Sequence, residues 1–186
     1  MRFQPTELAD AWLVLPERHA DDRGFFVRTF CEDEFGAHGL PTRFPQSNDS
    51  HNSRAGTLRG MHLNLAGHWE SKLVRCSRGA IFDVIIDVRP TSPTRDQWLG
   101  VELTAENGVA LFVPEGFAHG FLTLADDTIV SYQMGRAYEP GVAVGFRWDD
   151  PKFEVRWPMT PTVIAERDAT YPDYDPTALG LWGVGY

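Results

Sequence analysis

Cysteine, basic residues and long apolar runs are all scarce in this chain. Only Cys31 and Cys76 occur among its 186 residues, without CxxC spacing, so we expect neither a disulfide framework nor a thiolate metal site. Lysine and arginine number 17 against 26 acidic residues, and the net charge is −9. Because nucleic-acid binding depends on clustered basic residues that neutralise phosphates, this balance argues against a nucleic-acid partner.

No stretch reaches the roughly 20 apolar residues of a membrane-spanning helix, and residues 1–7 lack the apolar run of a secretory signal. We therefore expect a cytoplasmic protein with no membrane partner. The length fits one domain, residues 1–186, and no internal repeat or low-complexity linker indicates a second. Beyond Tyr171 the only expected contribution is packing by Trp182 and Tyr186.

Many short runs alternate in polarity, which is typical of β-strands. In residues 79–89, Phe82 and Val84 fall on one face, whereas Asp83 and Ile85 fall on the other. Further strands are predicted at residues 24–30, 57–63, 72–76, 97–103, 110–113, 120–124, 129–133 and 144–148, and short helices at 32–38 and near 161–168. The expected fold class is all-β, a jelly-roll β-barrel with a few short helices.

Residues 108–119 resemble the second motif of the cupin barrels, in which Gly, Pro-x-Gly and His follow at fixed spacing. Pro114 and Gly116 are expected to form a tight turn between strands, after which His119 projects into the barrel. Asp83 is expected to support a histidine. The motif therefore favours a cupin-like barrel with a site at its interior.

Many cupins hold a metal at this position, with further ligands from a first motif. Here the first motif reads His62-Leu63-Asn64, and Asn64 is a poor substitute for an imidazole ligand. His68 and Glu70 follow in a polar stretch that is expected to form a loop, although they could join His62 and His119 around a metal. We favour a site without a metal and keep the metal site as the alternative.

Ordered motifs over residues 21–168 resemble a single enzyme family. They are Asp21-Asp22-Arg23-Gly24-Phe25-Phe26, Gln46-x-Asn48-x-Ser50, Leu58-Arg59-Gly60-Met61-His62, Lys72-Leu73-Val74-Arg75-Cys76, Asp87-x-Arg89, Tyr132, Tyr138-x-Pro140 and Trp148-Asp149-Asp150-Pro151. Matches in this order are far more specific than any single motif. The chain resembles the dTDP-4-dehydrorhamnose 3,5-epimerase family. The resemblance implies a cupin-like homodimer that inverts carbons beside the 4-keto group of a nucleotide-linked 6-deoxyhexose, without a cofactor.

This chemistry requires a base, a proton donor on the opposite face and positive charge at the developing enolate oxygen, because protons beside a ketone are only weakly acidic. By resemblance, His62 is the base and Asp168 its orienting carboxylate, Tyr132 returns the proton, and Lys72 stabilises the enolate. The implied binding residues are Arg59 and His119 for the pyrophosphate or sugar, Arg23 and Phe26 of the partner subunit for the nucleotide, and Gln46, Asn48 and Tyr138 for further contacts.

Departures from the family pattern leave the substrate open. Arg28 stands where the family usually has an acidic residue near the nucleobase, so thymine, guanine and cytosine all remain candidates. Leu63-Asn64 replaces an aromatic-Gln pair after His62. The sequence therefore does not fix the sugar, or whether one carbon or both are inverted. The alternative functions are a metal-dependent cupin enzyme and a non-catalytic cupin that binds a sugar nucleotide.

Overall fold

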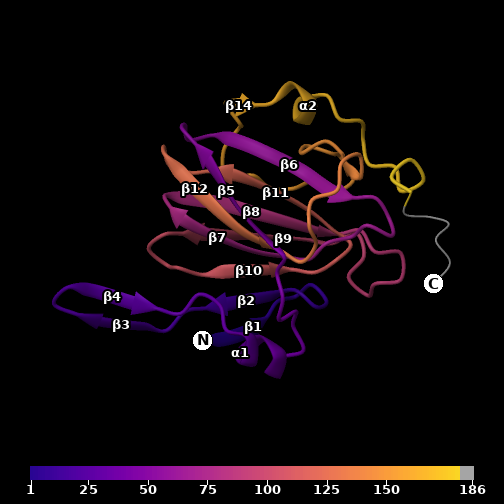
Figure 1. Ribbon diagram of the computed structural model, residues 1–186. Helices are drawn as coiled ribbons and strands as arrows, with labels where there is room; N and C mark the ends of the chain where they lie inside the picture. The colour runs from indigo at the N-terminus through magenta and orange to yellow at the C-terminus, as the bar shows by residue number, and fades with distance from the viewer. Residues whose placement is uncertain (181–186) are drawn as a thin grey trace.

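Two six-stranded sheets face each other in the structure, a computed structural model that describes residues 1–180 (Figure 1). In order, the first sheet contains β1 (Arg2–Pro5), β2 (Trp12–Leu15), β10 (Ala110–Val113), β7 (Lys72–Arg78), β12 (Thr128–Met134) and β5 (Gln46–Asn52). The second contains β13 (Ala143–Gly145), β6 (Thr57–Asn64), β11 (Phe117–Thr123), β8 (Ala80–Asp87) and β9 (Trp98–Thr104), with β14 (Val163–Ile164) paired to β6. This arrangement confirms the predicted all-β jelly roll. Trp182 and Tyr186 lie outside the described residues.

The predicted strands agree with the observed ones in most of the barrel, and the differences have local causes. The strand expected at 24–30 ends at Val27, and the one expected at 144–148 covers only 143–145. The sequence analysis missed β1, β2, β3 (Arg18–Asp21), β14 and above all β5, whose sequence QSNDSHN contains no apolar residue. A strand without apolar residues shows no hydrophobic alternation, so pattern analysis cannot detect it.

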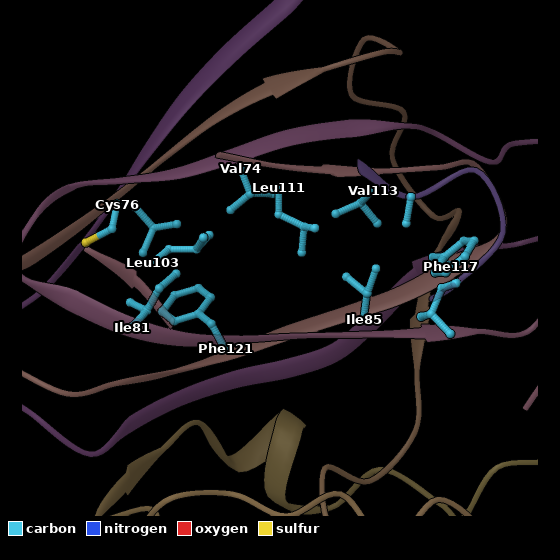
Figure 2. Packing of buried hydrophobic residues seen from close by; sticks show 12 residues of the cluster. Val74, Cys76, Ile81, Ile85, Leu103, Leu111, Val113, Phe117 and Phe121 are labelled. Carbon is cyan, nitrogen blue, oxygen red and sulfur yellow. The ribbon is translucent and has the colours of Figure 1, made fainter. Parts of the chain in front are cut away.

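The interior between the sheets is apolar toward one end. Figure 2 shows Val74 and Leu111 of the first sheet facing Ile81, Ile85 and Phe121 of the second, and all five side chains are buried. Polar groups occupy the rest of the space between the sheets. The barrel therefore has a packed apolar core and, next to it, a polar part of the interior that includes Lys72, Asp83 and His119.

The outer faces of both sheets are also covered in part. Val84 and Ile86 of β8 point outward and pack against Phe146, Phe153 and Leu179 from the C-terminal part of the chain. On the other sheet, helix α1 (Glu32–Ala37) contributes buried Phe35, one of the side chains that cover the outer face. The two faces predicted for β8 are thus both buried, and the face with Asp83 is the one that points inward.

A two-stranded hairpin of β3 and β4 (Gly24–Val27) projects away from the two sheets (Figure 1). Its outermost aromatic side chains are unusually exposed, 55% for Phe25 and 74% for Phe26. Isolated hairpins contribute little stability on their own. An arm with exposed aromatic residues is typical of a surface that another molecule covers.

Strand β6 carries one extra residue opposite β11. Arg59 pairs with Phe121 and His62 pairs with His119, so a step of three residues on β6 matches a step of two on β11. In a regular strand, residues three apart point to opposite faces. The bulge at Gly60 and Met61 therefore turns both Arg59 and His62 toward the interior.

We expect Gly60→Ala to lower the free energy of unfolding by about 3 kcal/mol. The φ of Gly60 is +144°, and a Cβ there would lie 2.6 Å from Cα of Gly120 on the neighbouring strand. Gly39→Ala is the matched control, because Gly39 has a φ of +69° but no atom within 4 Å of an added Cβ. Urea unfolding should give a loss of about 1 kcal/mol for this control. Equal losses in both variants would contradict the close approach of β6 and β11.

Candidate active site

The polar part of the interior is built from both sheets. The second sheet contributes Arg59 and His62 from β6, His119 from β11 and Asp83 from β8. The first contributes Lys72 from β7, Tyr132 from β12 and the inward residues of β5. Asn48 pairs with Tyr132, and directly opposed residues share a face, so the even-numbered residues of β5 line the same space.

His62 is bound to a carboxylate from the C-terminal part of the chain. Its Nε2 lies 2.8 Å from Oδ1 of Asp168 in helix α2 (Glu166–Ala169), and the main-chain N–H of Gly60 donates to Oδ2 at 3.2 Å. Because a carboxylate only accepts, Nε2 carries the proton and Nδ1 has the free lone pair. Within residues 1–180, no protein group is bound to Nδ1. The arrangement is that of a general base with an orienting carboxylate.

The carboxyl group of Asp168 is anionic at neutral pH. Burial opposes ionisation, but the hydrogen bond and charge of His62 and the Gly60 N–H outweigh it, so the pKa of Asp168 is lowered. The Asp168 side chain is 7% exposed, against 35% for His62. The carboxylate is therefore hidden behind a ring whose other edge reaches open space. The sequence analysis expected this pairing only from the family resemblance.

A second histidine and carboxylate pair lies beside the first. Nε2 of His119 is 2.8 Å from Oδ1 of Asp83, and these side chains are 5% and 0% exposed. The ring of His119 meets the ring of Tyr132 edge-on, with centroids 6.0 Å apart. The predicted support of a histidine by Asp83 is therefore present, and the histidine is His119.

Lys72 is buried, and Tyr132 is partly buried against the core. Burial, reinforced by the negative charge of Asp83, raises the pKa of the Tyr132 phenol, and Arg59 opposes this only in part. The phenol is consequently neutral and keeps a proton to donate. Burial lowers the pKa of Lys72, while Glu70, whose Oε1 is 3.6 Å from Nζ, opposes the shift.

Asn52 is a site residue that the sequence analysis missed. Its side chain is 2% exposed, and its Oδ1 accepts a hydrogen bond from Nε of Arg59 at 2.8 Å. Its Nδ2 donates to the main-chain oxygens of Ser50 and Thr128. The amide is therefore fixed and holds the guanidinium in one orientation. The sequence signal for Asn52 was its position two residues after Ser50, which continues the alternation of the motif Gln46-x-Asn48-x-Ser50.

Gln46, Asn48 and Tyr138 lie together at one end of β5. Gln46 donates to Oδ1 of Asn48 at 3.1 Å and accepts from the main-chain N–H of Tyr138 at 2.8 Å. The Tyr138 ring itself is 72% exposed. This group presents amides and an uncovered aromatic face, which suit hydrogen bonding and stacking of a planar ring.

Arg23 and Phe26 are not part of this cluster in a single chain. Both lie on the projecting β3–β4 hairpin, where Nη2 of Arg23 pairs with Asp21 at 2.6 Å. Near the base of the same arm, Arg28 pairs with Glu34 of α1 at 2.7 Å. The assignment of Arg23 and Phe26 to the partner's site stays a prediction.

Two of the departures from the family pattern have structural counterparts. Leu63 points outward into the apolar layer beneath the C-terminal part of the chain, and Asn64 donates to the main-chain oxygen of His68 at 3.1 Å. Asn64 is therefore occupied in shaping the segment 65–71. His68, in turn, pairs with Glu139 at 2.9 Å, away from His62 and His119.

Searches for two other kinds of site found nothing in residues 1–180. No group of three or more His, Cys, Asp or Glu side chains there is arranged to hold a metal ion. Over the same residues, no helix has the length and apolar character needed to cross a membrane. What the described site does offer is a base, neutral and cationic donors, and acceptors around one interior space, a combination suited to moving protons on a bound anion.

Comparisons with known proteins agree with this chemistry. The family model described as dTDP-4-dehydrorhamnose 3,5-epimerase matches residues 5–175. A dTDP-4-dehydrorhamnose 3,5-epimerase of Sinorhizobium fredii is 43% identical over 173 residues, 92% of this chain and 89% of that protein. A dTDP-4-dehydrorhamnose 3-epimerase of Streptomyces niveus is 35% identical, over 90% of this chain and 81% of that one. The Bacillus anthracis 3,5-epimerase structure with TDP and PPi bound has a TM-score of 0.90 at 38% identity, covering 93% and 99% of the two chains.

Proposed function

Since the chain belongs to the dTDP-4-dehydrorhamnose 3,5-epimerase family, we propose that His62 and Tyr132 carry the two proton transfers of a sugar-nucleotide epimerisation. The chain is an isomerase by family. The proposed substrate is a nucleotide-linked 4-keto-6-deoxyhexose, and the proposed proton transfers need no cofactor. The observation that carries the proposal is the placement of the two groups. His62, paired with Asp168 of α2, lies on one sheet, and a neutral Tyr132 lies on the sheet that faces it.

In the proposed first step, Nδ1 of His62 removes the proton from a carbon beside the ketone. Asp168 holds the ring in the tautomer with a free Nδ1 and stabilises the imidazolium that forms. The electron pair moves to the ketone oxygen, which becomes an enolate. The Lys72 ammonium stabilises this oxygen in an interior where water does not screen the charge.

In the second step, the Tyr132 phenol returns a proton from the opposite face, which inverts the carbon. Because the base and the acid stand on facing sheets, one sugar ring between them is reached from both sides. The His62 imidazolium then releases its proton to solvent, and solvent restores the proton of the phenolate. Arg59 and His119 are the proposed contacts of the pyrophosphate and sugar oxygens.

The proposed active form is a homodimer whose β3–β4 arm reaches the partner's site. This form would cover the exposed Phe26 and bring Arg23 to the nucleotide, next to Gln46, Asn48 and Tyr138. Light scattering should then give twice the chain mass, and a fully active monomer would contradict the shared site. We propose the cytoplasm as the compartment, which cell fractionation checks.

Asn52→Ala is expected to raise the KM for the sugar nucleotide about tenfold with little change in kcat. Without the Oδ1 acceptor, the Arg59 guanidinium is no longer held toward the anionic substrate. Steady-state kinetics measures the effect, and a melting curve checks folding because Asn52 also binds main-chain oxygens. Asn107→Ala, in the turn after β9, is the control and should leave KM unchanged. A fall in kcat equal to the rise in KM would contradict a binding role.

Proton-exchange NMR in deuterium oxide, with dTDP-, CDP- and GDP-linked 4-keto sugars, tests the proposal as a whole. Deuterium should enter at the carbons beside the ketone, and the positions labelled report whether one carbon or both are inverted. Absence of exchange with every substrate would favour a non-catalytic sugar-nucleotide-binding cupin. A stoichiometric transition metal bound through His62 and His119 would favour the metal-dependent alternative.

A further inference from the structure

Glu70 lies beside the buried end of Lys72 and has no role in the proposed function so far. It belongs to the segment 65–71 between β6 and β7, two residues before Lys72, which begins β7. Its Oε1 is 3.6 Å from Nζ of Lys72, and the two side chains are 13% and 10% exposed. An ion pair at this depth acts more strongly than a surface pair, because water screens it less.

The surroundings of Lys72 otherwise supply little negative charge. Its cross-strand neighbours are Val113 on β10 and Met134 on β12, which carry no charge. Tyr132 of β12 is a neutral phenol. The carboxylates that act on Lys72 are Glu70 from the loop and Asp83 from β8. Without these two carboxylates, burial would favour the neutral amine of Lys72.

These two carboxylates are not equivalent. Asp83 binds His119 through Oδ1, so its charge is shared with that ring. Glu70 forms no other ion pair within residues 1–180, and its one partner is Lys72. With its largely buried carboxylate beside Nζ of Lys72, Glu70 is placed to act on that ammonium.

We propose that Glu70 is a positioning residue that keeps the Lys72 ammonium charged and directed into the barrel. The inference rests on the proposed function, in which that ammonium stabilises the enolate oxygen. Glu70 itself does not touch the reacting atoms. It maintains the positive charge of Lys72 against burial and limits the directions in which the flexible side chain can point.

The chain offers a direct measurement, because Lys72 and Lys152 are its only two lysines. Protein labelled with [ε-13C]lysine gives one signal for each, and Lys152→Arg assigns them. In Glu70→Gln the titration midpoint of Lys72 should fall by about one pH unit or more. The Lys152 signal, from a residue paired with Asp96 on the outside, should not move. The alkaline limb of kcat/KM for epimerisation should shift to lower pH by the same amount.

Two further variants complete the test. Glu70→Asp keeps the charge on a shorter side chain and should give a smaller shift, which a merely structural role would not produce. Glu102→Gln removes one negative charge from an exposed position of β9 and should change neither profile. An unchanged Lys72 midpoint in Glu70→Gln would overturn the proposal. A fall in the midpoint without a change in the activity profile would support the action of Glu70 on Lys72 and refute the role of Lys72 in the proposed function.

Discussion

Replacing His62 by alanine is expected to lower the epimerisation rate about a thousandfold or more and to abolish solvent exchange beside the ketone. Nδ1 of His62 is the free base nitrogen of the site. His119 also pairs with a carboxylate, but its side chain is buried and its ring meets that of Tyr132 edge-on. Loss of the base therefore stops the first step, so neither labelled substrate nor product should form.

Deuterium incorporation followed by NMR measures this effect. His51→Ala is the matched control, because His51 lies on β5 with its side chain 54% exposed and pairs with Asp127. Asp168→Asn tests the carboxylate separately. It keeps the shape but removes the negative charge that stabilises the imidazolium, so exchange should slow about a hundredfold or more while some remains. Normal exchange in His62→Ala would remove His62 from the chemistry.

Tyr132→Phe is expected to separate two processes that the wild-type protein couples. Removing the hydroxyl deletes the proposed proton donor, so inversion should slow about a hundredfold, while exchange of the substrate proton should fall only a few-fold. His62 can still take a proton and return one from solvent to the same face. The phenylalanine ring fills the same space against His119, so no cavity is created.

The two rates come from one NMR time course, in which deuterated substrate and inverted product give different signals. Tyr174→Phe is the control for loss of a phenol. The Tyr174 hydroxyl is buried without a hydrogen-bond partner in the described residues, and its ring packs against Phe146 and Phe153. Its pKa is raised by burial to about 12, so this hydroxyl also stays neutral. Equal losses of exchange and inversion in Tyr132→Phe would contradict the division of roles.

The sequence predicted most barrel strands in which apolar and polar residues alternate, and the longest strand it missed is β5. Strand β8 was recognised from its regular pattern, whereas β5 carries Gln46, Asn48 and Asn52 toward the interior and polar residues outward. A strand that lines a polar site has no apolar face to detect. The signal in the sequence was the spacing of two residues between the amides Gln46 and Asn48, which is part of the family motif. Hydrophobic periodicity does not detect this spacing.

The sequence analysis named several residues that the fold brings together, but not the geometry that places them. The bulge that brings Arg59 and His62 to one face depends on the close approach of Gly60 and Gly120 on neighbouring strands, which no local pattern reveals. The ion pair of Glu70 with Lys72 was missed because Glu70 reads as part of a solvated loop. The roles expected for Arg23 and Phe26 stay predictions, because they require a second subunit.

The origin of Asp168 has a consequence for how the protein becomes active during synthesis. All strands of the first sheet, and β6, β8, β9 and β11 of the second, precede residue 135, whereas the partner of His62 comes 106 residues after it. A growing chain thus contains most strands of the barrel before it contains the carboxylate partner of the base. Docking of β14 beside β6 and of Asp168 onto Gly60 completes the site last. A chain that ends before α2 would lack this carboxylate and also Leu179, which covers the outer face of β8, so both its site and its packing would be incomplete.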